Sequence, residues 1–114
     1  MVTIYHNPAC GTSCNTLALL RDRGIDLEVV EYLKTGWNLE TLTDLTVRMG
    51  VGPRAILRER GTRAEALGLT DPATHDEAIL AAMVLEPILV NRPIVVGPKG
   101  AALCRPAELA LDLL

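Results

Sequence analysis

The stretch HNPACGTSCNT, residues 6–16, contains the cysteine whose surroundings are best suited to chemistry. Cys10 has only Pro, Ala, Gly, Thr and Ser among its nearest neighbours, whereas a core cysteine is expected within a periodic apolar run. A cysteine in a loop ahead of a helix faces unpaired backbone N–H groups, and these favour its thiolate. The position therefore predicts that Cys10 is a nucleophilic thiolate; the alternative is a small buried apolar side chain.

His6 precedes Cys10 by four residues, where the apolar run VTIY ends. An imidazolium at this point would lower the pKa of the thiol. A lone histidine is equally typical of a structural role, so both interpretations stay open here. His75 lies inside the polar stretch THDE and is expected on the surface of a helix.

Cys14 follows Cys10 at a spacing that differs from the C-x-x-C redox motif and from common zinc sites, so we predict no metal centre. Residues four apart on a helix lie near the limit of disulfide reach. We therefore favour Cys14 as a passive helix residue that faces the core, with a resolving thiol as the alternative. Cys104 ends a predicted strand and is expected to be packing.

Three arginines, Arg58, Arg92 and Arg105, stand in apolar surroundings. The planar guanidinium group suits carboxylate, phosphate and related oxyanions. Taken singly, each arginine is better explained by an ion pair or by a side chain lying along the surface. Taken together with a loop cysteine, the three predict a site for a tetrahedral oxyanion.

A β-α-β unit is expected to position the cysteines. Residues 2–5 and 25–33 have the β-branched pattern of strands, and the helical stretch between them, residues 12–24, stops at Gly24. Parallel strands in such a unit deliver the chain from the end of the first strand to the start of the helix. Cys10 and Cys14 lie at this edge.

A helical insert is expected next, at about residues 38–86. Asn38 is a suitable helix cap, Pro53 fits a first helical turn, and THDE from Thr74 to Glu77 has the form of a capping box. The expected helical stretches are 39–50, 53–61, 62–68 and 77–86.

The last third of the chain reads as a hairpin and a helix. Residues 93–97 and 101–104 are strand-like runs around the turn GPKG, and Pro106 begins a final helix. The order β-α-β, helices, β-β-α predicts an α/β protein of thioredoxin-like fold with a mixed sheet, as a single domain over residues 1–114. In that fold Pro93 takes the place of a cis-proline that faces the cysteine loop and brings Arg92 beside it.

Composition excludes several classes of protein. The chain has 114 residues, 49% of them hydrophobic, a net charge of only −3 and 3% aromatic residues. These values fit one core and lack the basic excess expected for binding nucleic acid or a membrane surface. No apolar run reaches the roughly 18 residues that span a bilayer, and no signal peptide is recognised. Three cysteines without the spacing of a disulfide framework fit a reducing compartment, so we expect a cytoplasmic protein. We also expect it to be a monomer.

The sequence closely resembles the glutaredoxin-dependent arsenate reductase family. The matching stretches run through the whole chain in order: TIYHNPACGTS, NTL, MG followed by RAILR, LGL, PILVNRPIVV and LCRPAEL. The resemblance implies a thioredoxin-like fold, arsenic detoxification as the function, and arsenate, glutathione and glutaredoxin as substrate, co-substrate and partner, with no bound cofactor.

The resemblance also assigns roles to residues. It implies that Cys10 is the single essential cysteine, that His6 and Ser13 tune it, and that the three arginines bind the oxyanion. The chemistry agrees, because a thiolate attacking an anion needs guanidinium and helix-terminal N–H groups, here of Gly11 and Thr12, to offset the repulsion. A covalent Cys10–arsenic adduct then turns the reduction into thiol exchange.

One departure from the family concerns Cys14, where family members commonly carry another residue, so an internal disulfide step stays open as an alternative. Two other functions are considered. A thioredoxin-fold regulator that binds RNA polymerase has a C-x-x-C switch, whereas Ser13 takes the second cysteine's place here. A general thiol-disulfide oxidoreductase without arsenate activity is the other, and arsenate-dependent turnover separates all three.

Overall fold

The computed structural model describes all residues, 1–114, and they form two compact units. Unit 1 comprises Met1–Thr35 and Arg92–Leu114, and unit 2 comprises Gly36–Asn91. None of the helices combines the length and the apolar character that crossing a membrane requires. The single domain with an insert at about 38–86 stays a prediction.

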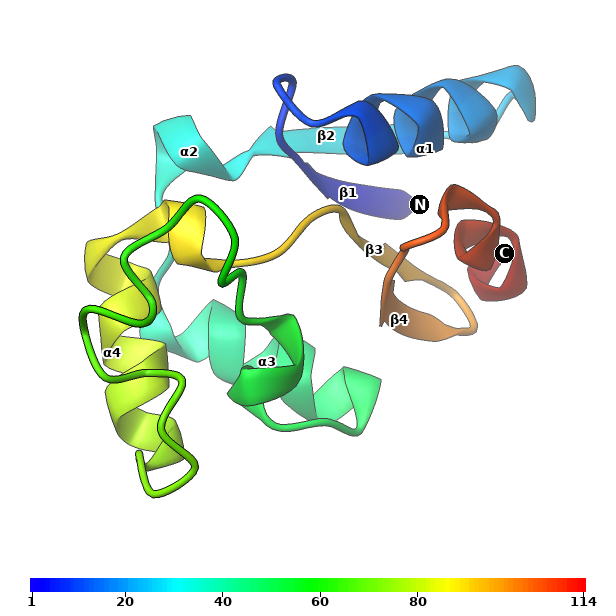
Figure 1. Cartoon of the computed structure of the whole chain (residues 1–114). Coiled ribbons are helices and arrows are strands. Elements are labelled where there is room, and N and C mark those ends of the chain that lie inside the picture. Colours follow the sequence, from blue (N-terminus) through cyan, green and yellow to red (C-terminus); the bar gives the residue numbers. More distant parts are fainter. The chain divides into compact units, whose positions relative to one another are not determined.

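Unit 1 is built on a four-stranded mixed sheet (Figure 1). Its strands are β1 (Val2–His6), β2 (Leu27–Glu31), β3 (Ile94–Gly97) and β4 (Gly100–Leu103). The order is β2-β1-β3-β4, with β1 and β2 parallel and the other two pairs antiparallel. The predicted β-α-β unit, the hairpin and the mixed α/β sheet are therefore confirmed.

Helix α1 (Gly11–Asp22) and the 3-10 helix η3 (Ala107–Leu113) pack on one face of this sheet (Figure 1). Ile4 and Val95 are cross-strand partners, and both are fully buried in the core beneath the two helices. The α1 side of this core is formed by Leu17 and Leu20, spaced as neighbours on one helix face. The core thus fixes α1, and with it the loop at the N-terminus of α1.

Unit 2 is helical. Its elements are α3 (Leu39–Met49), η1 (Pro53–Ile56), α4 (Asp76–Leu85) and η2 (Pro87–Leu89), and α4 contacts the other three. The predicted cap of α3 is confirmed, since Asn38 Oδ1 accepts the Thr41 N–H at 2.8 Å. Gly50 ends α3 at φ 68°, a left-handed conformation that glycine adopts without strain.

Two of the helices expected in residues 53–68 were wrong. The helix at Pro53 is a single 3-10 turn, because the chain then pairs with a distant segment: Leu57 bridges Val90, and the Arg58 N–H donates to Leu89 O at 2.7 Å. Residues 62–68 form turns. At Leu57 and Arg58, backbone hydrogen bonds to residues far along the chain replace the hydrogen bonds of a helix.

Three further features differ from those expected from the sequence. Thr74 does not cap α4, because its hydroxyl donates to Gly68 O at 2.6 Å, and His75 takes the N-cap position without a side-chain bond. The second strand ends at Glu31, where the short helix α2 (Tyr32–Thr35) begins. The final helix is of the 3-10 type, with Pro106 as its cap residue.

Candidate active site at the start of helix α1

The loop between β1 and α1 is held by its own backbone and by Asn7. The Asn7 carbonyl accepts the Cys10 N–H at 3.0 Å, and its side-chain Oδ1 accepts the Ala9 N–H at 2.9 Å. Asn7 is buried, so this turn is firmly anchored. Cys10 becomes the N-cap residue of α1, with an extended backbone (φ −103°, ψ 122°). The thiol therefore lies where the free N–H groups of the first helical turn converge.

The environment of Cys10 favours the thiolate. Burial raises the pKa of this thiol, whose residue is only 8% exposed. Hydrogen bonds from the Ser13 backbone N–H and from two arginine side chains outweigh burial and lower the pKa from 9.0 to about 7. About half of the molecules then carry the thiolate near neutral pH.

The two arginines are Arg92 and Arg105, both of unit 1. Arg105 Nη1 lies 3.6 Å from Cys10 Sγ and also donates to the Arg92 carbonyl at 2.9 Å. The peptide bond between Arg92 and Pro93 is cis, and so is the bond that follows Arg105. One guanidinium thus ties the thiol to the segment that leads into β3.

Ser13 links His6 to the thiol. His6 Nδ1 and Ser13 Oγ are 2.6 Å apart, and the same oxygen accepts the Asn7 N–H at 3.1 Å. Ser13 Oγ thus takes part in two hydrogen bonds at once, one with the ring and one with the loop backbone. Burial lowers the pKa of His6, so the ring is neutral at pH 7. The positive charge near the thiol therefore comes from the arginines and not from an imidazolium.

Gly11 and Thr12 occupy the first turn of α1. Their N–H groups have no acceptor within the helix, as is usual for the first turn. Such groups bind anions at helix N-termini, so this end of α1 can hold part of an oxyanion next to the thiol.

Cys14 was expected to face the core, and this prediction was wrong. It is exposed rather than facing the core, because the buried face of α1 is formed by Ser13, Thr16, Leu17 and Leu20. Its thiol donates to Pro8 O at 3.3 Å, and its N–H donates to Cys10 O at 3.0 Å. None of the three cysteines is in a disulfide.

Cys104 directly follows β4 and is fully buried in the core of unit 1. Burial, reinforced by the charge of Asp112, raises the pKa of Cys104 to about 12. This thiol stays protonated and packs as a small apolar side chain, as the sequence predicted.

Arg58 belongs to unit 2, where it follows the bridge residue Leu57. It is half-buried, and its Nε donates to Arg60 O at 3.0 Å. The structure thus brings Cys10, Arg92 and Arg105 together within unit 1, and the part of Arg58 in the site stays a prediction.

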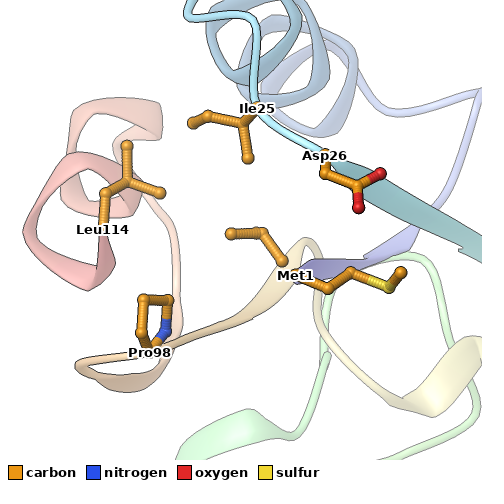
Figure 2. A pocket seen from close by; sticks show the side chains of 6 residues that line it. Met1, Ile25, Asp26, Pro98 and Leu114 are labelled. Carbon is orange, nitrogen blue, oxygen red and sulfur yellow. The ribbon is translucent and has the colours of Figure 1, made fainter.

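Two pockets of unit 1 differ in their relation to the thiol. The one in Figure 2 has a volume of about 240 Å³ and is lined by Met1, Val2, Ile25, Asp26, Pro98 and Leu114. Val2 begins β1 whereas Cys10 follows its other end, roughly 13 Å along the strand, so this pocket is separate from the site. The second pocket, of about 330 Å³, includes Thr12 and Pro106 and borders it.

Sequence reasoning missed Asn7, which three hydrogen bonds place at the centre of the loop. The signal was present in the dipeptide Asn7-Pro8, which is typical of turns. His, Cys, Asp and Glu residues form no cluster that could hold a metal ion.

Comparison with known proteins identifies the relatives of the chain. The model of the ArsC family matches residues 5–113. The arsenate reductase of Rhizobium meliloti (strain 1021) is 53% identical over 99% of this chain and 81% of its own length. That of Escherichia coli is 47% identical over 99% and 80%. The solved arsenate reductase from Vibrio cholerae superposes with a TM-score of 0.93 at 41% identity, covering 99% of this chain and 97% of that one.

Proposed function

The chain belongs to the ArsC family, and on that premise we propose that it is an arsenate reductase that works through a covalent Cys10–arsenic adduct. The observation that carries the proposal is the contact of Arg105 with Cys10 Sγ at 3.6 Å, at the start of α1. It gives a thiolate at neutral pH a cationic neighbour that also attracts a tetrahedral anion.

The first step is attack of the Cys10 thiolate on arsenic. The sulfur–arsenic bond forms, and one hydroxyl group of arsenate takes up a proton from solvent and leaves as water. Both reactants are negative, so the step needs positive groups around the developing charge. Arg92, Arg105 and the N–H groups at the start of α1 supply them, and we propose that Arg58 completes the set.

Glutathione then resolves the adduct. Its thiolate attacks Cys10 Sγ, a disulfide forms, and the sulfur–arsenic bond breaks with its electron pair remaining on arsenic, which leaves as arsenite. Two electrons thus pass from two thiols to arsenic. The thiolate of glutaredoxin attacks the glutathione sulfur of the mixed disulfide and restores the Cys10 thiol.

His6 and Ser13 position the nucleophile in this scheme. The bond between them, 2.6 Å long, fixes Ser13, whose backbone N–H stabilises the Cys10 thiolate. The reaction consumes reduced thiols, which are kept available in the cytoplasm, and we propose that the enzyme acts there as a monomer.

The test is arsenate reduction by the purified protein, with glutathione and glutaredoxin each supplied or withheld. Arsenite release is expected only when arsenate and both thiol components are present, and Cys10→Ser is expected to abolish it while leaving the circular dichroism spectrum unchanged. Substantial turnover by Cys10→Ser overturns the mechanism. Reduction of disulfide substrates without any activity toward arsenate would favour the general oxidoreductase.

A further inference from the structure

Of the residues that line the pocket beside the active site, only Thr12 takes part in the mechanism above. Its volume is about 330 Å³, within the range of about 300–1,000 Å³ of small-molecule sites. It is lined on one side by Thr12, Asn15 and Leu19 of α1, and on the other by Pro106, Ala107 and Glu108 at the start of η3. The α1 residues recur at the spacing that places side chains on one helix face.

Each wall of this pocket begins within two residues of Cys10 or of Arg105, which contacts the Cys10 thiol. Thr12 comes two residues after Cys10, in the first turn of α1. Pro106 comes directly after Arg105, whose Nη1 is 3.6 Å from Cys10 Sγ. A molecule that presents a sulfur atom to Cys10 can therefore extend into the pocket.

The polar groups of the pocket select the ligand. The Glu108 carboxylate and the Asn15 amide are exposed, and neither makes a hydrogen bond or ion pair within the protein. A carboxylate repels arsenate and accepts bonds from an ammonium group, whereas the amide N–H groups donate to a carboxylate. An ammonium and a carboxylate on one carbon form the α-amino-acid end of a γ-glutamyl thiol.

We propose that this pocket binds the γ-glutamyl end of the glutathione molecule that resolves the Cys10 adduct. Glu108 accepts from the ligand's ammonium group, the Asn15 amide donates to its α-carboxylate, and Leu19 and Ala107 contact the methylene groups between. The sulfur then lies over Cys10. This inference rests on the proposed function, because it names the site of the resolving thiol.

Steady-state kinetics with two thiols test the proposal. Glu108→Gln is expected to raise KM for glutathione about two- to fivefold, the effect of an exposed ion pair, and Glu108→Lys by more, with KM for arsenate unchanged. Asn15→Ala is expected to act in the same direction. Cysteinylglycine lacks the γ-glutamyl group, so its kinetics are expected to be insensitive to these changes. Asp112→Asn removes an exposed charge from η3 outside the pocket and is the matched control.

A binding experiment separates this inference from the proposed function. S-methylglutathione cannot react, and its titration is expected to shift the amide resonances of Asn15 and Ala107 in the wild type but only weakly in Glu108→Lys. Equal shifts in both proteins, or an equal rise of KM in Asp112→Asn, overturn the pocket assignment even if arsenate turnover is found. Absence of turnover with every thiol overturns the proposed function, and the titration still decides whether the pocket binds.

Discussion

Two cysteines of this chain carry the same group with opposite reactivity. The pKa of Cys10 is lowered to about 7, and that of Cys104 is raised to about 12. Both are buried, so burial alone does not separate them. The two thiols differ in the groups around them. Cys10 faces guanidinium and backbone N–H groups, whereas Cys104 lies among apolar side chains near the charge of Asp112.

Alkylation by iodoacetamide tests the reactivity of Cys10. In Cys14→Ser, the rate at Cys10 is expected to rise with pH to a midpoint of about 7, because only the thiolate reacts. Peptide mass spectrometry identifies the modified residue, and Cys104 is expected to stay unmodified in the folded protein. A midpoint at or above about 8.5, the value of a free cysteine, would refute the lowered pKa.

Replacing arginine by lysine tests the oxyanion site. Lysine keeps the charge but loses the planar two-point grip, so each of Arg58, Arg92 and Arg105 changed to lysine is expected to cost about 1–3 kcal/mol, or roughly ten- to a hundredfold in kcat/KM for arsenate. Arg48→Lys, on the exposed side of α3, is the control. Unchanged arsenate kinetics at all three positions would assign these arginines to structure alone.

Cys14 is expected to be dispensable. A regular first turn keeps the side chains of Cys10 and Cys14 near the limit of disulfide reach, so Cys14→Ser should retain turnover with glutathione. The check is one turnover of the wild type with arsenate and no glutathione, followed by mass spectrometry. A loss of about two daltons that links Cys10 to Cys14, with arsenite released, contradicts this and shows an internal resolving step.

At the residue scale, the sequence was sufficient for groups whose neighbours in the chain define their chemistry. Cys10 could be selected because loop residues surround it and a helix follows. The orientation of Cys14 could not, since it depends on which face of α1 the sheet covers, and that is set by strands from both ends of the chain. The hydrogen bond between Ser13 and His6 likewise could not be predicted without the fold.

At the scale of elements, the hairpin of β3 and β4 depends on a close approach to η3. A Cβ atom on Gly97 would collide with the Leu113 carbonyl oxygen, the same atom that accepts the Lys99 N–H at 3.2 Å. Gly97 is therefore required by space, and the end of η3 packs directly on the strand backbone.

Gly97→Ala is expected to lower the free energy of unfolding by about 1–3 kcal/mol, because backbone on both sides must shift. Gly52→Ala is the control, since its new Cβ would meet only the Asp76 side chain at 3.6 Å and its φ of −84° suits alanine. Urea denaturation of both variants measures the difference. Equal stability of the two would mean that the contact of β3 with η3 is loose.

Helices were predicted correctly where neighbouring residues determine the structure, and wrongly where pairing with a distant segment determines it. Asn38 capped its helix as expected because the bond is to Thr41, three residues on. The stretch after Pro53 has helical periodicity, yet Asn91 donates its N–H to Ile56 O at 2.7 Å and ends the turn. No local pattern in residues 53–61 reports a partner more than thirty residues away.

For the whole molecule, the lowered pKa of Cys10 couples stability to pH. A thiolate whose pKa falls from 9.0 to about 7 on folding stabilises the folded state fully above pH 9, and this contribution is lost as the pH falls to 7. The difference in unfolding free energy between wild type and Cys10→Ser is expected to be about 1–2 kcal/mol larger at pH 9 than at pH 7. Chemical denaturation at both pH values measures it. A difference that is the same at both values would contradict the coupling.

The contact between Arg105 and Cys10 has a consequence for the lifetime of the protein in oxidising surroundings. A half-ionised sulfur at neutral pH is susceptible to oxidation by peroxide, and the sulfenic acid that forms proceeds to irreversible sulfinic and sulfonic acids unless a thiol intercepts it. The buried, protonated Cys104 is spared. Oxidative inactivation of this chain is therefore concentrated on the Cys10 sulfur, and a small thiol that intercepts the sulfenic acid protects it.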